Sequence, residues 1–159
     1  MPDLRVALDT AGFTDVRTYL NTGNVRLTTR LRSTERVAAR LEEVFAADRG
    51  FEVPTAVFAP DAFARIAADA EALTEPGWTQ YVSLLCADPD SSGAVELGAY
   101  AEKHADQARV EVRGRAVHLG LAEGYAGARI DNNRIERMLR TPGTTRALSV
   151  VRRVAADWC

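Results

Sequence analysis

The chain of 159 residues contains few of the side chains from which metal sites, disulfide frameworks and common catalytic centres are built. Its two cysteines, Cys86 and Cys159, have no metal-binding spacing and are too few for a disulfide scaffold, so a reducing cytoplasm suits them best. Its two histidines, His104 and His118, belong to no recognisable Cys–His or Ser–His–Asp motif. We therefore expect no metal and no cofactor, and we assign no residues to catalysis.

Long hydrophobic runs are also missing. No stretch of about 18 apolar residues occurs, so no transmembrane helix is expected. The N-terminal segment "MPDLRVALDT" lacks the basic flank and the unbroken apolar core of a signal peptide. Hydrophobic residues nevertheless make up 47% of the chain, an ordinary share for a globular protein with a sizeable core. We predict a cytoplasmic protein that does not contact a membrane.

Lysine is nearly absent, because Lys103 is the only lysine among 20 basic residues and the others are arginines. From residue 128 to residue 159, seven arginines stand against three carboxylates, a net charge of +4, whereas the first 127 residues carry −6. A basic tail on an acidic body can bind an anionic partner, or it can pack against the body. We favour packing, because the tail also shows strong helical patterns.

Residues 1–59 are predicted to form one small unit. Two helices end at the pairs Gly12-Phe13 and Gly50-Phe51, and a strand follows each pair, so "AGFTDVRTYL" and "RGFEVPTAVF" repeat one pattern. With the intervening turn and strand, the order is α-β-β-α-β. One further strand in front would complete the βαββαβ arrangement of ferredoxin-like domains. The predicted elements are helices over residues 4–11 and 33–49 and strands over residues 16–20, 25–28 and 53–58.

Residues 60–159 are predicted to form a second α/β unit with C-terminal helices. The apolar run "YVSLLCA" indicates a strand that is buried on both faces, and Arg113-Gly114 indicates the turn of a hairpin. Asn133 followed by Glu136 predicts a capping box, and a last helix is expected to begin near Thr144. The fold class is therefore α+β, with two small α/β sandwich units, the first a ferredoxin-like unit without its first strand.

The turn between the first two strands is the first candidate site, formed by Asn21, Thr22, Gly23 and Asn24. Asn and Gly tolerate positive φ, and an Asn side chain can bond to nearby backbone, so a plain turn explains all four residues. In the alternative interpretation, the amides of the turn form a nest that accepts an anion or a carbonyl.

The segment "TPGTTRALSVVRR" is the second candidate site. If Thr144 or Thr145 caps the last helix, the free N–H groups of that helix end and the adjacent Arg146 would attract an anion. The alternative is simple capping, with Arg146 paired to a carboxylate of the acidic body.

Nucleic-acid binding would have to use the basic C-terminal segment. Arg134, Arg137 and Arg140 lie about one turn apart, which is typical of the solvated face of an amphipathic helix. The aromatic base readers that a nucleic-acid surface needs are not interleaved with them, so this interpretation is disfavoured.

The glycine-rich residues 124–127 lack the Lys-Ser/Thr ending of a phosphate loop. His118 lies on an apolar strand and is expected to be packed.

Two motifs resemble the bacterial domain-of-unknown-function family 1697. The first is "VRTYLNTGNV" over residues 16–25, and the second is "ERMLRTPGTTR" over residues 136–146. The resemblance implies an α/β fold but no activity, since the family has none that can be carried over. It draws attention to both candidate segments. The family's Asn-Trp pair after the final arginine is replaced here by Ala147-Leu148.

The family's N-terminal strand and Gly-rich segment have no counterpart in this sequence. In a ferredoxin-like sheet that strand is central, and the strands over residues 25–28 and 53–58 would expose unpaired backbone without it. We therefore expect the native reading frame to begin upstream of Met1. The chain as it stands is expected to be poorly stable or to pair with a second copy.

Three functional hypotheses remain open at this point. The leading one is a binding module for a small anionic ligand that uses the two candidate segments. The second is nucleic-acid binding through the basic C-terminal helices, and the third is a structural or homo-oligomerising protein without a ligand. The arginines of the second hypothesis are Arg129, Arg134, Arg137, Arg140, Arg152 and Arg153. Whether the protein is an enzyme is left open.

Overall fold

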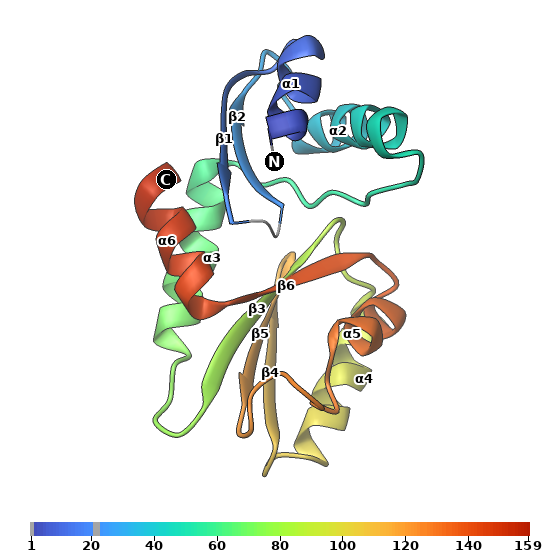
Figure 1. Cartoon of the computed structure of the whole chain (residues 1–159). Coiled ribbons are helices and arrows are strands. Elements are labelled where there is room, and N and C mark those ends of the chain that lie inside the picture. The colour runs from blue at the N-terminus through green and yellow to red at the C-terminus, as the bar shows by residue number, and fades with distance from the viewer. Residues whose placement is uncertain (1, 21–22) are drawn as a thin grey trace. The chain divides into compact units, whose positions relative to one another are not determined.

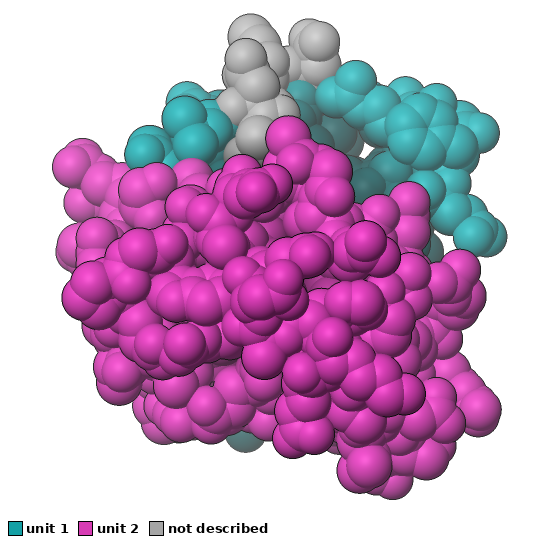
Figure 2. Space-filling model, turned by 90° about the horizontal axis from the view of Figure 1, so that it is seen from below, with its two compact units in different colours: residues 1–59, 158 teal, residues 60–157, 159 magenta. Residues whose placement is uncertain are grey.

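The structure is a computed structural model in which residues 2–20 and 23–159 are described. The chain separates into two compact units, which Figure 2 shows in different colours. Unit 1 comprises residues 1–59 with Trp158, and unit 2 comprises residues 60–157 with Cys159. Each unit combines helices with antiparallel strands, which confirms the α+β class. In the part of the chain that the structure describes, no helix is long and apolar enough to cross a bilayer.

Unit 1 is a hairpin with two helices packed on it (Figure 1). Its core is formed by five buried side chains, Leu4, Leu8, Phe13, Val37 and Leu41. The elements are α1 (Pro2–Thr10), β1 (Thr14–Tyr19), β2 (Asn24–Thr28) and α2 (Thr34–Arg49). The two strands pair antiparallel, and their register shifts between the pair Thr14–Thr28 and the pair Arg17–Arg26.

The sequence signals at the helix ends of unit 1 are confirmed. Ser33 is the N-cap of α2, and its hydroxyl accepts a hydrogen bond from the Arg36 backbone N–H at 3.3 Å. Gly12 follows α1 with a φ of 89°, a left-handed conformation that glycine adopts without strain. The chain then turns Phe13 into the core, where its side chain is only 3% exposed.

The second Gly-Phe pair behaves differently, and the predicted strand over residues 53–58 is wrong. Gly50 caps α2 with a φ of 77°, but Phe51 is 63% exposed and residues 52–59 form no strand. Pro54 has no N–H to donate to a ladder. The Thr55 N–H donates instead to the Glu42 carboxylate of α2 at 2.9 Å. The ferredoxin-like arrangement is therefore not confirmed for unit 1.

Unit 2 begins with α3 (Pro60–Ala72) and ends with α6 (Leu148–Trp158). Between these two helices, its elements follow the order β-α-β-β-α-β. Its four strands lie in the order β4-β5-β3-β6, and all neighbours are antiparallel. This is the split βαβ topology. The intervening elements are β3 (Thr79–Leu85), α4 (Ser91–Glu102), β4 (Ala108–Arg113), β5 (Ala116–Leu121), α5 (Asn132–Leu139) and β6 (Gly143–Ala147).

The two faces of this sheet have different coverings. Helices α4 and α5 pack on one face, where Val117, Leu119 and Leu121 of β5 meet Leu97 and other apolar side chains. Helix α3 lies on the opposite face, the His118 face, and Asp69 of α3 pairs there with Arg113 of β4. Helix α6 lies beside α3, and its Arg152 pairs with Glu71 of α3.

A close approach of two backbones fixes α4 against α5. A Cβ atom on Gly93 would lie 1.8 Å from the carbonyl oxygen of Met138, a distance that no side chain permits. The Asp90 N–H donates to the Leu139 carbonyl at 3.0 Å, and the Asp90 side chain caps α4 by accepting from the Gly93 N–H at 2.8 Å. Glycine at position 93 is therefore a packing requirement of this helix pair.

Two predictions about the C-terminal segment are wrong. The N-cap of α5 is Asp131, which accepts from the Arg134 N–H at 2.8 Å, so Asn133 and Glu136 form no capping box. Thr144 and Thr145 do not begin the last helix, because they lie in β6, and α6 begins at Leu148. Both threonines are β-branched and pair with β3, a placement that suits their stiff side chains.

The two Gly-Phe pairs offer a matched test of the unit 1 core. We expect Phe13→Ala to lower the free energy of unfolding of unit 1 by about 3–5 kcal/mol, because it removes a buried aromatic ring. Phe51→Ala should change it by less than about 0.5 kcal/mol, because that ring is exposed. Denaturant titrations followed by circular dichroism would measure both values. Equal losses in the two variants would contradict this account of the core.

Candidate functional site

The turn between β1 and β2 is only partly visible, because Asn21 and Thr22 lie outside the described residues. Gly23 has a φ of 79°, as the sequence predicts for a turn glycine. Asn24 begins β2, and its side-chain amide donates to the Tyr19 carbonyl at 3.0 Å across the end of the hairpin. This contact gives Asn24 a role in closing the turn, and a ligand role for the four residues stays a prediction.

Residues 144–146 lie in unit 2 and are part of strand β6. They do not cap a helix, so the prediction of an anion site at the N-terminus of the last helix is wrong. Ala147 precedes α6 and supplies no side-chain cap. The Arg146 guanidinium donates to the Thr145 carbonyl at 3.0 Å and contacts the Thr144 hydroxyl. Burial lowers the pKa of Arg146, since the charged form is partly desolvated. A ligand role for Thr144, Thr145 and Arg146 also stays a prediction.

Thr145 belongs to a hydrogen-bond network centred on Asn132. The Asn132 side-chain oxygen accepts from Thr145 at 3.0 Å and from the buried Ser83 hydroxyl at 3.4 Å. Its side-chain nitrogen donates to Glu136 at 2.9 Å and to the Gly143 carbonyl at 3.1 Å. The network fastens β6 to α5 and to the central strand β3.

Two further groups complete this Asn132 network. The Tyr125 hydroxyl accepts from the Asn132 backbone N–H at 2.7 Å and reaches the Thr145 hydroxyl at 3.4 Å. The Glu136 carboxylate also accepts from the Gly143 N–H at 2.9 Å. Glu136 and Thr145 are both part of the second sequence motif, so the structure gives that motif a structural role. The glycine-rich residues 124–127 contribute Tyr125, a role that sequence spacing did not reveal.

The arginines considered for nucleic-acid binding are mostly engaged within unit 2. Arg152 pairs with Glu71, and Arg153 pairs with Asp157 at 2.7 Å. Arg134 lies over the Tyr100 ring, with its guanidinium carbon 4.2 Å from the ring centroid. Arg129 donates to Gln107 at 3.0 Å, and Arg140 lies 3.9 Å from Asp90. These contacts leave few free guanidinium groups for phosphate contacts in this segment.

A cavity of about 160 Å³ lies on the His118 face of unit 2, and we call it the histidine cavity. His118 is 2% exposed, which confirms that it is packed, and neither ring nitrogen has a hydrogen-bond partner among the described residues. Buried polar atoms usually have a partner, so this side chain is unusual. The cavity is lined by Leu73, Glu75, Trp78, Gln80, Arg109, Val110, Glu111, His118 and Gly120.

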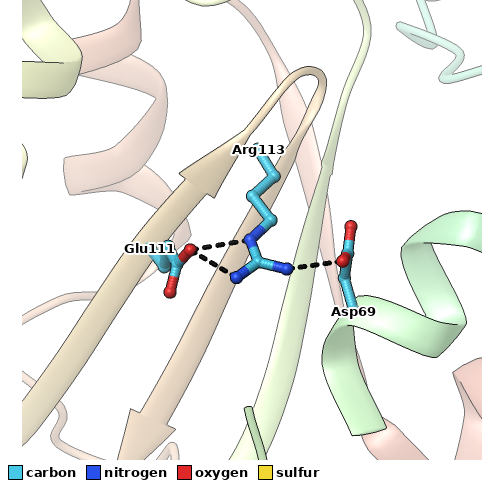
Figure 3. A network of polar contacts seen from close by, with 3 residues as sticks. All are labelled: Asp69, Glu111 and Arg113. Carbon is cyan, nitrogen blue, oxygen red and sulfur yellow. Dashed lines mark hydrogen bonds and ion pairs between the residues drawn. The ribbon is translucent and has the colours of Figure 1, made fainter. Parts of the chain in front are cut away.

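The charged groups around the histidine cavity are paired with one another. Arg113 lies between Glu111 and Asp69, with 2.7 Å from its Nε to the Glu111 carboxylate (Figure 3). Arg109 contacts Glu75, and its guanidinium carbon lies 4.6 Å from the centroid of the Trp78 ring. Each carboxylate that lines the cavity therefore faces an arginine.

A second hollow is an open groove of about 820 Å³ in unit 1, and we call it the arginine groove. Arg30, Arg36 and Arg40 line it, together with the α1–β1 connection and the end of β2. Arg40 pairs with Glu43 at 2.9 Å, whereas Arg30 and Arg36 make no ion pair within residues 2–20 and 23–159. This groove has no signature in the sequence, because its arginines come from a loop and a helix and share no motif.

No group of three histidine, cysteine or acidic side chains in the described part of the chain is arranged to hold a metal ion. Cys86 is partly buried and Cys159 is exposed, and neither forms a disulfide. The linings of the two hollows supply charged and hydrogen-bonding groups.

We expect the Asn132 network to contribute to the stability of unit 2. Asn132→Ala leaves Glu136, Thr145 and Ser83 without their shared partner, and we expect a loss of about 1–3 kcal/mol in the free energy of unfolding. Asn133→Ala is the matched control, because Asn133 is exposed on the same helix and alanine favours helix. Denaturant titration of both variants is the measurement, and a network without structural importance would give the same result for both.

Because His118 is buried, we expect the stability of the folded protein to depend on pH. Burial lowers the pKa of His118 in the folded state, so the unfolded chain takes up a proton below about pH 6.5 while the folded chain does not. Stability should therefore fall as the pH is lowered from about 7 to about 5. The charged groups that face His118 are Asp69, Glu75, Arg109, Glu111 and Arg113.

The measurement for this prediction is the free energy of unfolding at several pH values. His118→Phe removes the titrating group and should flatten the dependence between about pH 7 and pH 5. Hydrogen bonds to Ser92 and to the Gly93 N–H lower the pKa of Asp90, so that carboxylate contributes only in stronger acid. A slope that persists in His118→Phe would assign the effect to another group.

Comparison with known proteins places the chain in a family. No curated protein sequence and no solved structure matches it. Residues 1–118 match the family model described as a protein of unknown function, DUF1697. The match covers residues 1–59 of unit 1 and continues into β5 of unit 2, whereas the second sequence motif lies beyond it. Because this match spans well over half of the chain, the protein belongs to the DUF1697 family.

Proposed function

We propose that unit 1 binds a small anionic ligand in the arginine groove. The observation that carries this proposal is the convergence of three arginines on one groove in which only Arg40 has a carboxylate partner among the described residues. The ligand class is the one that the sequence suggested, a small anion, but the site is the arginine groove of unit 1 and not the segments 21–24 and 144–146.

The electrostatics of α2 support an anion in this position. Arg36 and Arg40 are four residues apart, so they are neighbours on the helix surface and their like charges repel. Glu43 compensates one of these charges. An anion between the two guanidinium groups would compensate the other, and the planar guanidinium fork matches phosphate and carboxylate oxygens.

Neutral groups in the groove add donors. The Thr29 hydroxyl oxygen accepts from the Leu31 N–H at 3.2 Å, which leaves its hydrogen able to donate to a ligand. Phe13 lies beneath the groove and anchors the α1–β1 connection to the core. The volume of about 820 Å³ lies within the range of small-molecule sites. A phosphate ester or a carboxylate of metabolite size fits this description.

The test is a thermal-shift series with sodium phosphate, sodium pyrophosphate and glucose 6-phosphate, and with neutral glucose as the ligand control. A probe at about a hundredfold its dissociation constant should add about 2.7 kcal/mol to the stability of the protein. Arg36→Ala and Arg40→Ala should each weaken binding at least about tenfold, because each removes a charge-assisted contact. Arg36→Lys keeps the charge and should lie between wild type and Arg36→Ala.

Arg49→Ala is the control variant, because Arg49 lies on the same helix and does not line the groove. It should bind the probes as wild type does. The proposal fails if no anionic probe raises the melting temperature, or if a shift persists in an Arg36→Ala/Arg40→Ala double variant.

A further inference from the structure

The β1–β2 hairpin carries a pair of arginines that the arginine groove does not include. The register places Arg17 of β1 directly opposite Arg26 of β2, so both side chains lie on the same face of the hairpin. Val25 and Leu27 pack against the core that the hairpin shares with α1 and α2 (Figure 1), so the alternation of a strand turns Arg26 to the opposite face. Arg17 is exposed and Arg26 is half-buried. We call this opposite side the hairpin face, and it is formed by Arg17, Tyr19, Asn24, Arg26 and Thr28.

The two arginines of the hairpin face are not compensated by any carboxylate that the structure describes. Neither guanidinium group of Arg17 and Arg26 makes an ion pair or a hydrogen bond within the described residues. Asp15 lies at the register shift of the same hairpin and forms no ion pair with either arginine. Like charges directly opposite each other in a sheet are destabilising. An anion bound across this pair would remove that cost.

The hairpin face leads into the arginine groove. Thr28 belongs to both, because it lines the groove and lies two residues from Arg26 on the same face of β2. Thr14, its partner across the hairpin, lines the groove as well. Two residues of a strand span about 7 Å, so the arginines of the hairpin face begin about that far from the groove. Residues 16–34 contain four arginines and no carboxylate, a net charge of +4, and the positive charge of the groove thus continues onto the hairpin.

The charge of the groove lining suits the end of a phosphate chain. Three arginines and Glu43 give the lining a net charge of +2. A terminal phosphate monoester carries a charge between about −1.5 and −2 at pH 7, whereas an internal phosphodiester carries a single negative charge. The groove therefore complements a terminal phosphate, and the hairpin face, with one free arginine on each strand, complements the diesters that follow it.

Tyr19 adds an aromatic ring to the hairpin face. It lies two residues from Arg17 on β1, is half-buried, and stacks on no other ring in the described part of the chain. Bases of a single strand stack on such rings, and this stacking tolerates any base because every base has a π-face. The bases of a duplex are already stacked on one another, so an aromatic ring beside arginines favours a single strand.

We propose that unit 1 binds the phosphorylated end of a single-stranded nucleic acid. The terminal phosphate occupies the arginine groove, the next phosphates lie across Arg17 and Arg26, and a base stacks on Tyr19. This inference rests on the anion site proposed for the groove, and it names the class of molecule to which the anion belongs. Contacts to phosphates and one stacking ring predict no preference for base sequence.

The experiment measures the fluorescence anisotropy of dye-labelled oligothymidylates of about ten nucleotides, a length within the site sizes of single-strand binders. Three strands are compared, with a 5′-phosphate, with a 3′-phosphate and with no terminal phosphate. At about 50 mM salt, one of the two phosphorylated strands should bind at least about tenfold more tightly than the strand without a terminal phosphate, because it adds charge-assisted contacts. An excess of glucose 6-phosphate should abolish this difference by occupying the groove.

The double variant Arg17→Ala/Arg26→Ala tests the hairpin face. It should weaken the binding of all three strands and lower the slope of log affinity against log salt by about 1.4, since each lost contact to a single strand removes about 0.7. The thermal shift with glucose 6-phosphate should stay as in the wild type. The variant removes a like-charge pair, so the hairpin should fold at least as well as before.

Two single variants complete the series. Tyr19→Leu keeps an apolar side chain and should weaken oligothymidylate binding at least about fivefold through the loss of stacking. Arg49→Ala is the control, because Arg49 lies on α2 outside the groove lining and outside the hairpin face. It should bind all three strands as the wild type does.

Failure of the groove proposal and failure of this inference give different results. If neither glucose 6-phosphate nor an oligothymidylate binds, the anion site itself is wrong, and this inference is wrong with it. If glucose 6-phosphate binds but no oligothymidylate binds more tightly than it does, the groove is a small-molecule site and this inference alone is wrong.

Three other results would also overturn the inference. Unchanged affinity in Arg17→Ala/Arg26→Ala would place the strand elsewhere. Equal affinity for a single strand and for a duplex of the same length would show that unstacked bases are not recognised. Equal affinity for inorganic polyphosphate, with no effect of Tyr19→Leu, would show that phosphate charge alone is bound.

Discussion

The antiparallel register of β3 with its two neighbours is the constraint on which the arrangement of unit 2 depends. Val82 is paired with His118 on one side and with Arg146 on the other, while Ser83 is paired with Val117 and Thr145. Adjacent residues of a strand point to opposite faces, so this register puts Ser83 and Thr145 beside Asn132. A slip of one residue would turn Thr145 away from Asn132 and leave the polar atoms of the network buried without partners.

The charges of unit 2 follow from the same topology. Strand β4 lies at one edge of the sheet, and its Arg109 and Arg113 reach Glu75 and Asp69 near the C-terminal end of α3. Glu111 of the same strand pairs with Arg113. Arg152 of α6 reaches Glu71 of the same helix. These contacts agree with the interpretation that the basic tail packs against the acidic body. The groups involved are exposed, and such pairs contribute little free energy. They orient α3 and α6, and the apolar contacts supply the stability.

Much of the fold could be predicted from the sequence, because most elements have local signals. Ser33, Gly12 and Gly50 mark helix ends by their own conformational preferences, and the run "YVSLLCA" marks a strand buried on both faces. The failures concern partners that are distant along the chain. Residues 53–58 have strand-like composition but form no strand, and "GTTRA" becomes β6 because β3 offers it an edge. Glu136 resembles a capping residue locally, yet its carboxylate accepts from Asn132 and Gly143.

The two hollows could not be predicted for the same reason, and they differ in how their charges are paired. The arginine groove is made by exposed side chains on a helix and a loop, where solvent screens repulsion and unpaired guanidinium groups are tolerated. The histidine cavity borders the buried His118, and each carboxylate that lines it has an arginine beside it. One composition rich in arginine therefore produces two different environments. Two of the three groove arginines have no acidic partner among the described residues, whereas the arginines beside the histidine cavity are paired with carboxylates.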